Sequence, residues 1–345
     1  MTDNLNSAAA AVAEPAILPN SEAVASGDDK KAQSSARDVN ASDAEFGGRL
    51  LVDKDRVFEH NAWDHVDWDS DQEREIQAAV ERHCTKDMPE EERERLDQEA
   101  AQRWDAFYRV NQNRFFKDRN WLRIEFPELF EETNTPRTVF EIGCGAGNTM
   151  FPLLASCPDS HLRVLGCDFS AEAVKVVRAN PMLDPARSDA FVWDLASEQL
   201  PEQVPPASVD VAVLIFVLSA LKPQQWANAI NNLKQMLKPG GVVLFRDYGR
   251  YDLAQLRFKA GRRIAENFYA RGDGTRVYFF TTDEIQELFG KDFVVEQNAV
   301  DRRLIVNRQR KLKMYRCWLQ GKFRKPLPSD GDSRGTSNAS AVPEQ

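Results

Sequence analysis

Between residues 138 and 249 the chain alternates short apolar runs with stretches of helical periodicity, and this alternation restricts the possible folds more than any other feature. The runs consist almost entirely of apolar and β-branched residues, as expected of strands that are buried on both faces. In order they read TVFEIG, LRVLGCDF, AFVWDL, VDVAVLIFVL and GVVLFRDYG. A parallel sheet with helices on both faces satisfies this pattern. We therefore predict a doubly wound α/β fold.

The segments between and after these runs complete the predicted sheet. Residues 170–180 begin with a serine N-cap and carry an apolar stripe, and residues 223–237 are helical up to a Lys-Pro-Gly-Gly sequence. Residues 293–300 (FVVEQNAV) and 302–309 (RRLIVNRQ) follow each other without room for a crossover helix, so we expect them to form an antiparallel hairpin. The prediction is a mostly parallel, seven-stranded sheet with an antiparallel last strand.

Composition predicts which other parts of the chain fold and which do not. Residues 1–45 contain 12 Ala, 6 Ser and no aromatic residue, too little apolar surface to offset the entropy of ordering. Residues 326–345 are rich in Ser, Gly, Pro and Asp, so we predict disordered tails at both ends. Residues 46–130 are expected to form an N-terminal helical region, with two exposed helices separated at Pro89, and residues 131–325 the α/β domain.

Several function classes are excluded or disfavoured by composition. No apolar run approaches the roughly 18 residues of a membrane span. The five cysteines are an odd number without a C-x-x-C pair, and the four histidines show no ligand spacing, so neither a disulfide framework nor a metal site is expected. We expect a cytoplasmic protein, since the start of the chain is acidic and resembles neither a secretory signal nor a mitochondrial presequence.

Charge is distributed unevenly along the chain, whose net charge is −9. Residues 246–325 hold 19 Lys and Arg against 10 Asp and Glu, and residues 302–325 hold 10 basic residues and no acidic one. Aromatic residues lie between these cations. Cations neutralise phosphates and aromatics stack on unpaired bases, so this stretch suits a nucleic-acid surface. A solvated end of an amphipathic helix explains the composition equally well.

A glycine-rich turn, Glu141-Ile-Gly143-Cys-Gly145-Ala-Gly147-Asn148, joins the first predicted strand to the next helix. Glycine permits a tight turn and close approach of a cofactor at the carboxyl edge of an α/β sheet. Asp168 and Asp194 end the next two strands, where carboxylates are placed to bind ribose hydroxyls and an adenine amine. The G-x-G-x-G spacing lacks the pyrophosphate-binding form G-x-G-x-x-G and favours S-adenosylmethionine over a dinucleotide.

From residue 138 to 308 the chain thus resembles the class I, Rossmann-like methyltransferases. Longer strings resemble a narrower family, the eukaryotic tRNA N3-methylcytidine methyltransferases, over nearly all of the predicted folded length. These strings are WDAFYRVNQNRFFKDRNWL, FEIGCGAGNTMFPLL, CDFSAEAV, LIFVLSAL, LFRDYGRYDLAQLRF and ENFYARGDGTRVYFFT. Residues 58–68 (FEHNAWDHVDW) are similar to the branch that acts on threonine tRNAs. The tails, residues 1–45 and those from Asp330 onward, match nothing in the family.

The resemblance implies methylation of N3 of cytidine 32 in the anticodon loop of tRNA, with S-adenosylmethionine as cofactor and an aminoacyl-tRNA synthetase as a candidate partner. It also implies that the N-terminal helical region covers the cofactor and binds RNA. The implied cofactor-binding residues are Trp104, Tyr108, Gly143, Gly145, Asp168, Asp194, Leu195 and Ile215. The resemblance further implies that Lys117 and Arg119 line the site, where they order the cofactor lid or contact RNA. From the charge of the basic stretch we predict Arg308, Arg310 and Lys311 as RNA-binding residues.

The chemistry needs no general base, because N3 of neutral cytosine already offers a lone pair. Alignment and electrostatics should carry the reaction. Positive charge moves onto the base during transfer, so a carboxylate near its exocyclic amine would stabilise the transition state, and we predict Asp247 for this role, with Arg246 facing the same cavity. The alternative is a structural ion pair between Arg246 and Asp247. Two other functions remain open: methylation of a protein or small molecule, and a non-catalytic tRNA-binding subunit.

Overall fold

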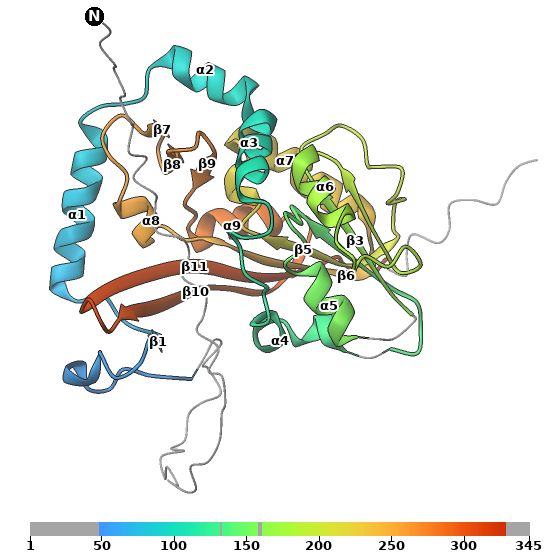
Figure 1. The fold of residues 1–345 in the computed structure, drawn as a ribbon, viewed down its shortest axis with the longest axis horizontal. Coiled ribbons are helices and arrows are strands. Elements are labelled where there is room, and N and C mark those ends of the chain that lie inside the picture. Colours follow the sequence, from blue (N-terminus) through green and yellow to red (C-terminus); the bar gives the residue numbers. More distant parts are fainter. Residues whose placement is uncertain (1–47, 132, 158–160, 329–345) are drawn as a thin grey trace, which may run out of the picture.

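The computed structural model describes residues 48–131, 133–157 and 161–328. The predicted tails, 1–45 and nearly all of 326–345, therefore lie outside the described residues. Eight strands form one sheet in the order β1-β10-β11-β6-β5-β2-β3-β4 (Figure 1). Its parallel part confirms the five predicted runs: β2 (Arg137–Ile142), β3 (Leu162–Asp168), β4 (Ser188–Val192), β5 (Val209–Ile215) and β6 (Leu237–Tyr248).

Each face of the sheet is covered by helices, and side chains alternate between the two cores. Val139 packs with α5 (Met150–Ser156) and α6 (Ala171–Arg178), whereas Phe140 packs with α7 (Pro223–Met236) and α9 (Thr282–Phe289) on the other face. The predicted helix starts are confirmed: the Ser170 hydroxyl accepts from the Ala173 N–H at 3.1 Å. The doubly wound fold therefore follows from strands that are apolar on both faces.

The predicted antiparallel end of the sheet is confirmed, but its strands and turn lie at other residues than predicted. Residues 293–309 do not form a hairpin, because β10 (Val294–Asn307) is one continuous strand and pairs with β11 (Leu312–Arg324). Asp301, which lies between the two segments predicted to form the hairpin, is fully buried and ion-paired with Arg246 and Arg303. The turn lies at residues 308–311, and the basic stretch is mostly strand, so its interpretation as a helix end is also wrong.

The β10–β11 hairpin extends beyond the rest of the sheet. β11 pairs with β6 only from Trp318 to Arg324, so residues 312–317 run past the carboxyl end of β6 by roughly 20 Å. We call residues 302–317 the arm; Figure 1 shows it running toward α1 (Ser70–Cys84). β1 (Ala62–Asp64) pairs along β10, and Trp63 packs on Leu304 and Val306. Residues 58–68 thus support the arm.

The remaining elements precede β2 or follow β5 and β6 in the chain. Two helices separated near Pro89 are confirmed as α1 and α2 (Glu90–Gln98), followed by α3 (Ala100–Asn111). Leu122, Phe126 and Leu129 share one hydrophobic core with the sheet, so residues 122–130 pack as part of the α/β body. The shorter elements are η1 (Lys54–Arg56), α4 (Leu122–Glu125), η2 (Pro127–Phe130), η3 (Leu218–Ala220), α8 (Leu253–Leu256), β7 (Arg263–Ala265), β8 (Phe268–Ala270) and β9 (Arg276–Tyr278).

Candidate active site

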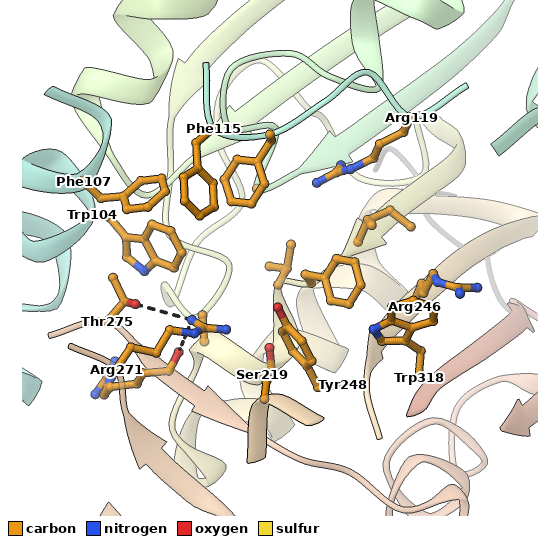
Figure 2. A pocket seen from close by; sticks show the side chains of 18 of the residues that line it. Trp104, Phe107, Phe115, Arg119, Ser219, Arg246, Tyr248, Arg271, Thr275 and Trp318 are labelled. Carbon is orange, nitrogen blue, oxygen red and sulfur yellow. Dashed lines mark hydrogen bonds between the residues drawn. The ribbon is translucent and has the colours of Figure 1, made fainter. Parts of the chain in front are cut away.

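A cavity of about 950 Å³ opens at the carboxyl ends of β2, β3, β5 and β6. This is the edge at which open α/β sheets bind ligands. The volume is near the top of the roughly 300–1,000 Å³ range of small-molecule sites. Figure 2 shows Trp104, Phe107 and Phe115 on one side of the cavity and Trp318 beside Arg246 on the other. The cavity therefore has room for more than one ligand.

Two glycines of the turn have different tasks. Gly143 lines the cavity with φ +68°, and a Cβ added to it would lie 2.5 Å from the Val217 side chain. Gly145, with φ +55°, is not among the lining residues; its N–H donates to the Asp168 carboxylate at 2.9 Å. A Cβ on Gly145 would lie 2.5 Å from the Tyr108 hydroxyl. Gly145 thus positions Asp168 and Tyr108, and only Gly143 offers bare backbone to a cofactor.

Asp168 is a buried carboxylate at the carboxyl end of β3, and we call this side of the cavity the cofactor end. It lines the cavity and accepts from the N–H groups of Gly145 and Ser170, each at 2.9 Å. Burial raises the pKa of Asp168 to about 6, against which these hydrogen bonds act. A carboxylate offers about four acceptor sites, so Asp168 can accept a further hydrogen bond from a ligand in the cavity. Asp194 and Leu195 line the same end, as predicted.

Helix α3 covers this end of the cavity. Trp104 and Tyr108 both line it, with ring planes 28° apart and centroids 6.2 Å apart. Asp105, between them, accepts from the Ser170 hydroxyl at 2.6 Å and the Glu172 N–H at 3.1 Å. Sequence reasoning missed Asp105, because no local pattern shows that its carboxylate meets the N-terminus of α6, whose N-cap Ser170 lies 65 residues further along the chain. Bare backbone at the turn, strand-end carboxylates and aromatic cover together fit S-adenosylmethionine.

Arg119 anchors the segment that follows α3. Its guanidinium donates to Glu141 and to the Thr149 hydroxyl, each at 2.9 Å, and its N–H donates to the Asn148 carbonyl. Burial raises the pKa of Glu141 to about 7, and Arg119 opposes this rise. Arg119 lines the cavity but is held by the glycine-rich turn. Lys117 also lines the cavity, is exposed and makes no ion pair with any residue described.

Arg246 and Asp247 point in opposite directions, as neighbours on a strand must. Arg246 lines the cavity, lies 5.0 Å from the Trp121 ring and 4.8 Å from the Trp318 ring, and pairs with Asp301. Asp247 is fully buried behind the cavity wall, so the expectation that both residues face the cavity holds for Arg246 alone. Their mutual ion pair was the wrong alternative, since Arg246 pairs with Asp301.

Asp247 instead fixes the loop after β5. Its carboxylate accepts from the Ser219 N–H at 2.9 Å and the Tyr248 N–H at 2.8 Å. Burial raises the pKa of Asp247 to about 6. Ile215 at the end of β5 lines the cavity as predicted, and Phe216 follows with φ +60° and a ring centroid 4.8 Å from that of Tyr248. A bulky residue at positive φ is a strained conformation of the kind that clusters at functional sites.

Cations form much of the far wall of the cavity, and the sequence analysis missed Arg257, Arg271 and Arg276. Arg271 lies over the Tyr248 ring at 5.5 Å and donates to the Thr275 hydroxyl at 3.4 Å, drawn in Figure 2. Alternate residues of the hairpin complete the wall: Arg303, Ile305, Met314, Arg316 and Trp318. Arg308, Arg310 and Lys311 do not line the cavity; they occupy the tip of the arm.

Two classes of feature are absent from the part of the chain that the structure describes. No group of three or more His, Cys, Asp or Glu side chains there is arranged to hold a metal ion. No helix there has the length and apolarity needed to span a bilayer.

Comparison with known proteins identifies the family. A model described as a methyltransferase domain matches residues 140–243. The tRNA N(3)-methylcytidine methyltransferase trm140 of Schizosaccharomyces pombe is 48% identical over 304 residues, which cover 86% of this chain and 97% of that protein. The chain belongs to the tRNA N(3)-methylcytidine methyltransferase family.

Other members agree with this assignment. The Drosophila melanogaster tRNA N(3)-methylcytidine methyltransferase Mettl2 is 50% identical over 287 residues, covering 81% of this chain and 88% of that protein. The Saccharomyces cerevisiae tRNA(Thr) (cytosine(32)-N(3))-methyltransferase is 48% identical over 288 residues, covering 82% of this chain and 46% of that protein. The predictions of a methyltransferase fold, of S-adenosylmethionine as cofactor and of this family are confirmed.

Proposed function

We propose that this tRNA N(3)-methylcytidine methyltransferase family member transfers a methyl group from S-adenosylmethionine to N3 of cytidine 32 in the anticodon loop of threonine tRNA. The observation that carries the proposal is the continuity of one cavity, in which the cofactor residues of β2, β3 and α3 and the base of the cationic arm are walls of the same space. The name of the yeast relative, which specifies tRNA(Thr) and position 32, supports the choice of substrate.

The residues around the cavity suit a direct displacement. When bound, S-adenosylmethionine supplies a methyl group on a positively charged sulfur. The N3 lone pair forms the new bond to carbon while the carbon–sulfur bond breaks, and the positive charge passes to the base. Asp168 and Asp194 would hold the cofactor, and Trp104 and Tyr108 would exclude water above it. Arg246 stays protonated and paired with Asp301, so it organises the wall and moves no proton.

The target base must be unpaired, because N3 is occupied in a Watson–Crick pair. The substrate half of the cavity offers aromatic surface to such a base through Phe216, Tyr248 and Trp318. RNA-binding proteins commonly stack an extruded base on aromatic side chains. This lining supports a loop nucleotide as the substrate.

The arm supports binding of the tRNA backbone. Four of its cations make no ion pair with a carboxylate of the described chain: Arg308, Arg310, Lys311 and Lys313. Together with Lys117 they are the proposed phosphate contacts, and Arg119, being anchored to Glu141, acts by positioning. We further propose a cytoplasmic location, supported by five cysteines that form no disulfide, and an aminoacyl-tRNA synthetase partner, supported by the family resemblance.

Methylation of defined tRNAs tests the proposal. The purified protein would be incubated with S-adenosylmethionine and transcripts of threonine and serine tRNA, and 3-methylcytidine would be located by mass spectrometry. We expect product at position 32 of threonine tRNA and none in a matched transcript with uridine at that position. Binding of S-adenosylmethionine without methylation of any tRNA, including native tRNA and tRNA supplied with the synthetase, would overturn the proposal and favour a protein or small-molecule substrate or a non-catalytic role.

A further inference from the structure

The indole of Trp318 lines the substrate half of the cavity, but its N–H has no acceptor. Trp318 lies on β11, where it pairs with Tyr248 of β6, and only 8% of its surface is exposed. Its Nε1 is buried and has no hydrogen-bond partner among the residues that the structure describes. Figure 2 shows this nitrogen on the side of the ring that faces Tyr248 and the hollow. A buried donor without an acceptor is rare in native proteins, and at the wall of a cavity it indicates an acceptor that arrives with a ligand.

Two guanidinium groups hold the ring of Trp318 in place. That of Arg316 lies 4.7 Å from the ring, and that of Arg246 lies 4.8 Å from it. Arg316 precedes Trp318 by two residues on β11. Arg246 pairs with Gln320, which follows Trp318 by two residues, so the two cations approach from opposite directions along the strand. The faces of the ring are therefore occupied, and its edge, which carries the N–H, is the part that a ligand can meet.

The ion pairs around the ring favour an uncharged acceptor. Arg246 is paired with Asp301. Arg316 is paired with Asp252 at 2.8 Å, and both carboxylates are fully buried. The positive charge beside the ring is thus compensated, so this wall suits a neutral acceptor better than a phosphate. The neutral acceptor that cytosine offers beside N3 is its carbonyl oxygen, O2.

A donor beside the reacting nitrogen distinguishes cytosine from adenine. Displacement needs a ring nitrogen with a free lone pair, and uracil and guanine carry a proton on the corresponding nitrogen. Adenine does not, because its N1 has a lone pair and an exocyclic amine next to it, as N3 of cytosine has. The two bases differ on the other side of that nitrogen, where cytosine has O2 and adenine has a C–H group. Cytosine would pair the donor, whereas adenine would leave it buried and unpaired, which is the stronger basis of rejection.

We propose that Trp318 is a specificity-determining residue whose Nε1–H donates a hydrogen bond to O2 of the target cytosine and so selects cytosine over adenine. This inference rests on the proposed function. The hydrogen bond contributes to binding, because O2 loses electron density as positive charge passes to the base and the bond does not strengthen in the transition state. Its removal should therefore raise the KM for tRNA and leave kcat nearly unchanged.

Two variants separate the N–H from the ring. Trp318→Phe keeps an aromatic ring between the two guanidinium groups and removes the N–H, whereas Trp318→Leu removes both. Each would be assayed on threonine tRNA with cytidine 32. The same tRNA with adenosine 32 would be tested as an inhibitor of that reaction, which needs no methylation of adenosine. We expect Trp318→Phe to raise the KM for the cytidine tRNA about 5- to 100-fold, the factor for a buried donor that loses its acceptor, and to leave the inhibition constant of the adenosine tRNA unchanged. Trp318→Leu should raise the KM by at least the same factor.

Controls separate this role from a loss of structure. Trp68→Phe is the matched substitution, because Trp68 also lies under a guanidinium, that of Arg302 at 4.4 Å, but does not line the cavity. It should leave the ratio of the KM to the inhibition constant unchanged. Calorimetry should give all three variants the wild-type affinity for S-adenosylmethionine, since Trp318 lies across the hollow from Trp104 (Figure 2).

Two results would overturn the inference. One is an unchanged KM of Trp318→Phe for the cytidine tRNA. The other is an equal rise in this KM and in the inhibition constant of the adenosine tRNA, which would mean that Trp318 acts by packing and does not meet O2. Failure of the proposed function is recognised separately, because the wild-type protein would then leave cytidine 32 unmethylated.

Discussion

The substitution Gly145→Ala adds one methyl group and tests whether the glycine-rich turn determines the position of Tyr108 in the cavity. In Gly145→Ala the new Cβ would lie 2.5 Å from the Tyr108 hydroxyl, so the tyrosine ring must move. The residue also keeps φ +55°, which costs an L-amino acid about 1–2 kcal/mol. Displacing Tyr108 would remove its proposed aromatic contact to the sulfonium, worth about 0.5–2 kcal/mol. We therefore expect S-adenosylmethionine affinity to fall roughly 2- to 30-fold, with about 1–2 kcal/mol lost from the free energy of unfolding.

A second substitution separates the loss of cofactor affinity from the loss in the free energy of unfolding. In Gly145→Ala with Tyr108→Phe the hydroxyl is gone, and the next ring atom, Cζ, would lie 3.4 Å from the new Cβ, an ordinary contact. Calorimetry should then give the affinity of Tyr108→Phe alone, while thermal unfolding still reports the backbone strain. If the double variant binds the cofactor no better than Gly145→Ala, or if Gly145→Ala binds like wild type, Tyr108 does not rest on this glycine.

Three further perturbations follow from the site. Asp168→Asn should abolish cofactor binding in calorimetry without unfolding the protein, and retained affinity would contradict the ribose assignment. Burial raises the pKa of Asp168 to about 6, so the affinity of the wild-type protein for S-adenosylmethionine should fall as the pH drops below 6 and the carboxylate is protonated. The unliganded protein should instead become more stable as the pH falls from 6 toward 3.8, the ordinary pKa of aspartate, because the folded state binds this proton more tightly than the unfolded state. Changing the unpaired arm cations to Gln should weaken tRNA binding and flatten its salt dependence by about 0.7 to 0.9 per lost contact; an unchanged slope would place the tRNA elsewhere. The residues changed are Arg308, Arg310, Lys311 and Lys313, and Arg316 is kept because it is paired with Asp252 at 2.8 Å.

Local sequence signals were sufficient to predict the parallel part of the sheet. Apolar runs of strand length, the N-cap at Ser170 and the glycines of the turn depend on neighbours in the sequence, so they predicted β2 to β6 and the cofactor end of the cavity. Asp168 and Asp194 were found because the carboxyl end of a parallel strand is a defined place in the fold.

The antiparallel end itself was predicted, but its strand bounds and register were missed because they depend on distant partners. Asp301 resembled a turn residue, but Arg246 and Arg303 neutralise it within a strand. The basic stretch had the period of a strand, with Met314, Arg316 and Trp318 on one face, and its charge obscured that period. The same period of two would have shown that Arg246 and Asp247 cannot share a face.

The position of β11 sets the order in which the molecule can be completed. Among the strands of the described residues it is the last to leave the ribosome, yet it lies inside the sheet, between β6 and β10. Until it emerges, β6 has an open edge of unpaired amides and carbonyls, and no strand joins the β1–β10 pair to the rest of the sheet. Contacts of such long sequence separation form slowly and leave apolar surface exposed in the meantime. A nascent chain that terminates within β11 is therefore expected to aggregate rather than to yield a smaller enzyme.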